Sequence, residues 1–140
     1  MSYFTRHVVT LSMDASTAGT GEAFTSEPVN SFIHSIRYVH STSGGLSTTC
    51  HLQISGEITG IPVLAIPDFV GTGESKTFYP RVDVCGSSAG YNNYTTAAAE
   101  IERVKDRVAI AQERLKFEIT TSSSTGDNIG TGTFHVLIGG

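Results

Sequence analysis

The clearest β-strand signal in this chain is the run SFIHSIRYVH at residues 31–40. Successive side chains of a strand point to opposite faces, so the run divides into two sets. One face carries Ile33, Ser35, Arg37 and Val39, and the other carries Phe32, His34, Ile36 and Tyr38. Both sets are partly apolar, which is typical of a strand that lies between a core and a second surface.

The same rhythm continues on both sides of this run, where short apolar or alternating stretches are separated by Ser, Thr and Gly turns. Alternating stretches lie at residues 5–13, 48–55, 75–81, 114–121 and 131–138. Two further stretches, at residues 22–27 and 60–66, lie beside or contain proline, which donates no N–H to a sheet. We therefore expect an edge strand at 22–27, and an edge strand or a packed crossing at 60–66.

Roughly eight strands with turns about every 8–12 residues predict an all-β fold, an antiparallel β-sandwich or jelly roll. The length of 140 residues fits a single domain, residues 1–140, with residues 1–4 as a flexible N-terminal arm.

Residues 95–116 break this rhythm, because they contain nine of the 22 charged side chains and neither Gly nor Pro. Apolar residues recur there at intervals of three and four, which is the helical period. We expect one short helical insertion near 96–106, a short strand near 107–111 and a longer strand at 114–121. A single helix that extends to residue 112 is the alternative.

The composition argues against several classes of function. The chain has 9 Lys and Arg against 13 Asp and Glu, a net charge of −4, and its polar surface comes largely from 18 Thr and 16 Ser. This balance lacks the basic surface that nucleic-acid binding requires. No apolar run approaches the roughly 20 residues of a membrane helix, and residues 1–7 lack the apolar run of a secretory signal. We expect no nucleic-acid or membrane partner, and a product that stays in the compartment where it is made.

Residues 86–90, GSSAG, match the G-x-S-x-G turn that exposes a nucleophilic serine, here Ser88, in serine hydrolases. Asp106 or Asp127 and then His135 follow in the matching chain order. That turn belongs to a parallel α/β sheet, however, and Ser and Gly are abundant in this chain. We interpret 86–90 as a loop and expect no enzymatic activity, so a hydrolase acting through Ser88 is a hypothesis to exclude.

The histidines and cysteines do not form a recognisable metal-binding pattern. No C-x-x-C or H-x-x-x-H spacing is present, and three Gly-Thr-Gly turns complete no phosphate-binding loop. We therefore expect no cofactor and no metal. Cys50 and Cys85 are interpreted as two buried free thiols, with one disulfide as the alternative. The histidines are scattered along the chain, at His7, His34, His40, His51 and His135.

Five short segments resemble, in this order, a family of tailed-bacteriophage structural proteins: SIRYV at 35–39, GIPVL at 60–64, TFYPR at 77–81, ERLKF at 113–117 and GTFHV at 132–136. From residue 5 to residue 140 the chain is similar to the jelly-roll capsid cement, or decoration, proteins of short-tailed phages such as the Bordetella phage. The resemblance implies a homodimeric β-sandwich, made in the host cytoplasm, on the outer surface of an icosahedral virion head. There it would clamp neighbouring major capsid proteins, without catalytic residues.

Aromatic and cationic side chains in the arm, in predicted loops and in the charged segment are the candidate contacts to the capsid or the dimer partner. They are Tyr3, Phe4, Arg6, Phe69, Tyr91, Tyr94, Arg103 and Arg107. The alternative function is a receptor- or carbohydrate-binding β-sandwich module of a phage fibre. Trp, the best platform for stacking sugars, is absent from the chain.

Overall fold

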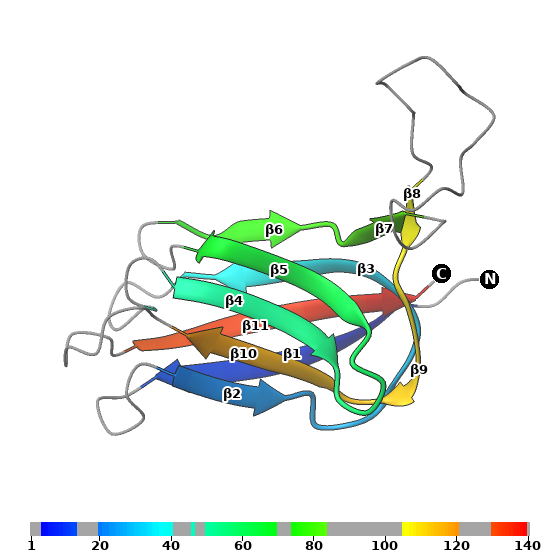
Figure 1. Cartoon of the computed structure of the whole chain (residues 1–140), viewed down its shortest axis with the longest axis horizontal. Helices are drawn as coiled ribbons and strands as arrows, with labels where there is room; N and C mark the ends of the chain where they lie inside the picture. The colour runs from blue at the N-terminus through cyan, green and yellow to red at the C-terminus, as the bar shows by residue number, and fades with distance from the viewer. Residues whose placement is uncertain are drawn as a thin grey trace, which may run out of the picture.

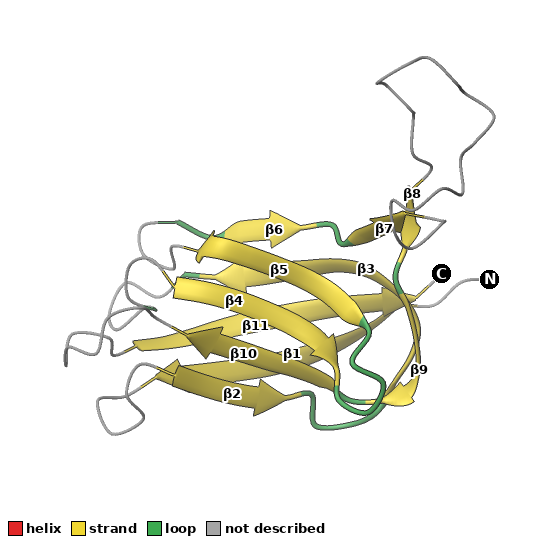
Figure 2. Cartoon of the chain, viewed as in Figure 1, coloured by secondary structure: helices red, strands yellow, loops and turns green. Residues whose placement is uncertain are grey.

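The computed structural model describes residues 4–13, 20–40, 46, 50–69, 74–83, 105–120 and 130–139, and these form strands, turns and loops without a helix (Figure 2). Nine strands build two facing sheets (Figure 1). Sheet A has the strand order β1-β11-β3-β6, with a fifth strand, β9 (Ala109–Glu113), paired to β3 beside this path. Sheet B has the order β2-β10-β4-β5. The bounds are β1 Phe4–Met13, β2 Thr20–Phe24, β3 Val29–Val39, β4 Cys50–Gly56, β5 Pro62–Phe69, β6 Lys76–Phe78, β10 Leu115–Thr120 and β11 Gly130–Gly139.

The chain passes repeatedly from one sheet to the other. β1 and β3 lie in sheet A, whereas β2, between them in sequence, lies in sheet B. Near the end of the chain, β10 inserts between β2 and β4, and β11 inserts between β1 and β3. All these neighbours are antiparallel. Eight antiparallel strands wound in this way form a jelly roll, which confirms the predicted fold class.

The core lies between the two sheets and is filled by the inward side chains of the alternating strands. Phe134 on β11 joins the sheets, since its ring centroid lies 5.2 Å from that of Tyr38 in sheet A and 5.2 Å from that of Phe117 in sheet B. Such aromatic pairs add roughly 0.5–1.5 kcal/mol each beyond the burial of their area. Further side chains with no exposed surface are Leu11, Ile33, Ile36, Leu46, Leu52, Ile54 and Leu115.

The alternation of β3 is interrupted once. Leu137 on β11 pairs with Ser35, but Ile138 pairs with Ile33 rather than with His34. His34 is therefore the extra residue of a β-bulge. Ile33 and Ile36 are both fully buried as a result. The two predicted faces are thus right from Ser35 to Val39, and wrong for Ile33 and His34, because the bulge shifts the parity.

The two stretches that lie beside or contain proline both form edge strands, as expected. β2 is one edge of sheet B, and β5 is the other. Pro62 is the first residue of β5, whose only sheet neighbour is β4. Proline at this position removes no ladder hydrogen bond from the middle of the sheet.

The predicted helical insertion is wrong where the structure describes that segment. Lys105–Arg107 form the short strand β8, which pairs with β7 (Arg81–Asp83). Ala109–Glu113 form β9, which pairs with β3. A helix ending at 106 and the alternative helix to 112 are both contradicted, whereas the strand predicted near 107–111 is confirmed two residues further on. Residues 96–104 lie outside the described residues.

Burial explains why helical spacing did not produce a helix in this segment. Val108 and Ile110 are 3% and 2% exposed, and the backbone N–H of Ile33 donates to the carbonyl of Val108 at 2.9 Å. Pairing with β3 and packing against the core therefore outweigh the local helical preference, which is a weak determinant by itself. Within the described ranges, no helix has the length and apolar character needed to cross a membrane.

Candidate binding face

The outward side chains of sheet A form two rows over its strands. One row runs from Arg6 on β1 through Leu137 on β11 to Ser35 on β3. The next row runs across β1, β11, β3 and β6 through Val8, His135, Arg37 and Thr77. An open pocket of about 310 Å³ lies over the rows, lined by Val39 and by all of these residues except Val8. We call this surface the arginine face.

The arginine face is cationic, because within the described residues neither of its two guanidinium groups is paired with a carboxylate. The four strands β1, β11, β3 and β6 contain no Asp or Glu. Arg37 Nη1 donates to Thr77 Oγ1 at 2.6 Å, which orients the guanidinium and leaves its other N–H groups as donors. Among the described residues, no ion pair involves Arg6 or Arg37.

An aromatic row borders the arginine face at the β-bulge. The His34 ring lies between two exposed rings in edge-on contacts, 5.4 Å from Phe4 and 6.0 Å from Tyr79 between centroids. Phe4 is 51% exposed and Tyr79 is 59% exposed. His34 Nδ1 also lies 3.1 Å from the Ser35 hydroxyl, within hydrogen-bond distance. Because the rings meet at steep angles, they do not form one coplanar stacking surface.

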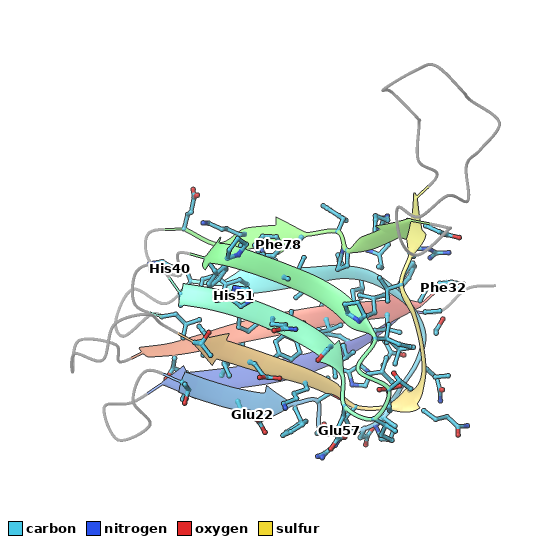
Figure 3. The ribbon with its side chains drawn as sticks, viewed as in Figure 1. Glu22, Phe32, His40, His51, Glu57 and Phe78 are labelled. Atoms are coloured by element: carbon cyan, nitrogen blue, oxygen red, sulfur yellow. The ribbon has the colours of Figure 1, made fainter. Side chains whose placement is uncertain are left out.

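The cations on the sheet B side, by contrast, are paired with carboxylates of the chain. Lys116 on β10 lies between two carboxylates, with Nζ 3.1 Å from Glu118 Oε1 and 3.6 Å from Glu22 Oε2. The bond to Glu118 raises the pKa of Lys116. At the end of the sheet, Arg114 donates to both oxygens of Glu57 at 2.5 and 2.7 Å and lowers the pKa of that carboxyl. Figure 3 labels Glu22 and Glu57 at the lower border of sheet B.

A buried carboxylate holds the turn between β4 and β5. Glu113, the last residue of β9, is 3% exposed, and its Oε1 accepts the backbone N–H groups of Ile58 at 3.0 Å and Thr59 at 3.1 Å. The Thr59 hydroxyl donates to Oε2 at 2.8 Å. The Thr59 N–H contributes most to lowering the pKa of Glu113. A side chain at Gly56 would overlap Glu113 Oε1, so this close approach requires glycine. The turn exposes Ile58.

Two of the predicted contact residues, Phe4 and Arg6, are exposed on β1 and border or line the arginine face. Arg107 is half-buried at the end of the sandwich, where its guanidinium lies 4.7 Å from the Phe32 ring centroid and donates to the Gly139 carbonyl at 3.2 Å. Tyr3, Tyr91, Tyr94 and Arg103 lie outside the described residues.

Phe69 is a correction to the predicted contacts. Its side chain is 1% exposed and lies 5.1 Å from Tyr38 between ring centroids. The strand β5 extends as far as Phe69, which pairs with Cys50 instead of lying in a loop. An aromatic side chain at this inward position fills the core and cannot reach a partner.

Sequence reasoning missed Arg37, His135 and Thr77 as members of one surface. Each lies on a different strand, and only the register of β11 against β3 and of β3 against β6 makes them neighbours. A signal was present in the sequence, since the segments that form β1, β11, β3 and β6 contain Arg and His but no Asp or Glu.

Ser88 and Asp127 lie outside the described residues, while Asp106 is exposed on β8 and His135 lies on the arginine face. The described sheets are antiparallel, unlike the parallel sheet of a G-x-S-x-G enzyme. Within the described ranges, no three His, Cys, Asp or Glu side chains gather as a metal site would require.

Cys50 is a buried free thiol that donates to the Phe69 carbonyl at 3.4 Å. Burial raises the pKa of Cys50 to about 11. Its predicted partner in the alternative disulfide, Cys85, lies outside the described residues.

Comparison with known proteins yields little. No family model matches the chain, and no curated protein matches it. Among solved structures, the crystal structure of FLHE aligns with 98% of this chain and 96% of that chain, at 10% sequence identity and a TM-score of 0.40. A similarity this low carries no argument about the function of this chain.

Proposed function

We propose that this protein is a capsid decoration protein, which binds the outside of an icosahedral phage head and stabilises it by clamping neighbouring major capsid proteins. The observation that carries the proposal is the arginine face, an exposed surface with apolar and cationic side chains and no carboxylate on its strands. The segments that resemble phage cement proteins lie in or beside the strands of this jelly roll, so the resemblance follows the framework of the fold.

The dimensions of the surface suit such a contact. β1, β11 and β3 are 10 or 11 residues long, so their outer side measures about 34 Å by about 15 Å. A standard interface buries about 800 Å² on each partner. The outer side of these three strands, on which the arginine face and its aromatic border lie, therefore provides more than half of one such side.

The stabilising mechanism would be physical rather than chemical. DNA inside a filled head pushes the shell outward, and a rigid sandwich across a junction between capsomers adds contact area that must separate before the shell opens. A homodimer that grips two capsomers would also gain avidity, because the second contact forms at a high effective concentration.

The test uses purified heads with the protein present, removed by stripping or deleted, and then added back. We expect copy numbers close to that of the major capsid protein and a lower temperature of DNA release without the protein. Unchanged DNA release on heating would contradict the proposal. A few copies per particle, together with binding on a glycan array, would instead indicate a receptor-binding module of a fibre.

A further inference from the structure

We propose that the arginine face binds an acidic, extended segment of a partner polypeptide, with Arg6 and Arg37 holding a carboxylate of that segment in the pocket. This inference rests on the proposed function and specifies the chemistry of the partner surface. A tight protein contact needs more than a flat strand surface, and this face supplies both a charged pocket and apolar surroundings.

Charge complementarity is the first argument. The chain as a whole carries a net charge of −4, yet the strands of the arginine face contain only cationic charged residues. Among the residues that the structure describes, no carboxylate pairs with Arg6 or Arg37, unlike the cations on the sheet B side. A guanidinium without an internal carboxylate remains available for a two-point bond to an external one, the geometry that arginine forms best.

The geometry supports a shared anion rather than two separate ones. Arg6 and Arg37 lie two strands and two residues apart, which corresponds to about 12 Å between their backbones. Their long side chains line one pocket of about 310 Å³. The Thr77 hydroxyl holds Arg37 in place at 2.6 Å, so less side-chain freedom is lost when an anion binds.

The apolar surroundings favour a polypeptide over other anions. Leu137 and Val39 line the same pocket, and exposed Val8, Phe4 and Tyr79 flank it. Aliphatic and aromatic side chains of an extended segment can pack on these residues while its carboxylate enters the pocket. A nucleic acid would need a larger basic surface, and the rings of the aromatic row do not form one coplanar platform for a sugar.

The first experiment is independent of any capsid. End-capped hexaglutamate is titrated into the full-length protein, and amide signals are followed by NMR. We expect shifts at residues 6, 35–37 and 135, which weaken at high salt and are lost in the double variant Arg6→Gln/Arg37→Gln. The matched control, Arg114→Gln/Lys116→Gln on the sheet B side, keeps the shifts. Thermal unfolding of each variant verifies that it is folded.

Several results of this titration would overturn the inference. These are the absence of shifts at millimolar peptide, equal shifts with hexaglutamine, or shifts that persist in the Arg6→Gln/Arg37→Gln variant. Stronger shifts from a single-stranded oligonucleotide or a sialylated glycan would overturn the assignment to a polypeptide. Dimerisation through this face, seen as loss of the peptide shifts at high protein concentration, would assign the face to a second copy of the chain instead.

The second experiment separates this inference from the proposed function. Binding to stripped heads is measured for the wild type and for both double variants. We expect the Arg6→Gln/Arg37→Gln variant to bind at least tenfold more weakly and the sheet B variant to bind like the wild type. Equal binding by all three would overturn the inference and leave the proposed function standing. A wild-type protein that binds hexaglutamate but does not bind heads would overturn the proposed function and leave the inference about the acidic segment standing.

Discussion

The outer sides of the two sheets are built on the same antiparallel framework, yet they treat charge in opposite ways. On the side of sheet B, Lys116 lies between Glu22 and Glu118, and Arg114 is paired with Glu57. On sheet A, Arg6 and Arg37 are exposed, and the strands β1, β11, β3 and β6 contain no Asp or Glu. The difference teaches that the cations on the sheet B side are paired within the chain, whereas no ion pair among the described residues involves Arg6 or Arg37. Sheet A is therefore the side for which we propose a partner.

The largest predicted effect is a loss of folding stability that affects both sheets, because the two sheets share one core. Phe134→Ala removes the ring that contacts Tyr38 and Phe117 and should lower the free energy of unfolding by ~3–5 kcal/mol. Urea denaturation measures this change. Val8→Ala on the exposed surface is the control and should leave the midpoint nearly unchanged. A similar midpoint for both variants would show that the sheets are not joined through Phe134.

A smaller effect is expected from overfilling the core beneath the arginine face. A Cβ at Gly132 would lie 2.7 Å from Leu46 Cδ1 and 2.8 Å from Tyr38 Cε2. Gly132→Ala should therefore destabilise the protein by ~1–3 kcal/mol. The exposed neighbour change Thr131→Ala serves as the control in the same urea titration. A Gly132→Ala protein as stable as the control would mean that Leu46 and Tyr38 move aside without cost.

The contact between Glu113 on β9 and the turn between β4 and β5 should be sensitive to acid. The lowered pKa of Glu113 means that its carboxylate stabilises the fold fully above the ordinary value of about 4.3. That contribution is lost as the pH falls through the lowered pKa. Glu113→Gln should be less stable than the wild type at pH 7, and the difference should shrink below about pH 4.

Unfolding midpoints from neutral to acidic pH test this expectation for Glu113. Glu57→Gln is the comparison variant, because the pKa of Glu57 is lowered by the exposed Arg114 instead. The Glu57 contribution should weaken at high salt, and that of the more buried Glu113 should not. Parallel pH curves for the wild type and Glu113→Gln would contradict the assigned role of Glu113.

The smallest expected effect is a difference in unfolding midpoint between an arginine variant on the sheet B side and one on the arginine face. Arg114→Gln removes a partner of Glu57 and should lower the unfolding midpoint slightly, with the loss diminishing at high salt. Arg37→Gln removes a cation that forms no ion pair with the described residues, so the midpoint should stay the same or rise. A clear loss of stability in Arg37→Gln would mean that Arg37 serves the fold rather than a partner.

Much of the fold could be predicted from local pattern. The alternation at 5–13 and 131–138 corresponds to β1 and β11, and the apolar set Leu115, Phe117 and Ile119 is fully buried on β10. The prolines correctly indicated the edge strand β5. These features succeed because a period of two and a missing N–H act within a few residues of chain.

Three features could not be predicted in this way. The bulge at His34 arises because Ile33 pairs with Ile138, about 100 residues away in the chain. The strand β9 forms because β3 and the core provide its partners, although its spacing favoured a helix. Phe69 was assigned to a loop because the end of β5 depends on its pairing with Cys50.

The amino-acid sequence by itself determined that this chain is a β-sandwich, since alternation and turn residues act locally. Only part of the candidate site could be predicted from the sequence, because Phe4 and Arg6 were expected to be exposed near the N-terminus. Tertiary structure decided that Arg6, Arg37 and His135 belong to one surface. The physical reason is that the strands of a jelly roll become neighbours through long-range pairing, and register, which no short segment encodes, sets which side chains share a face.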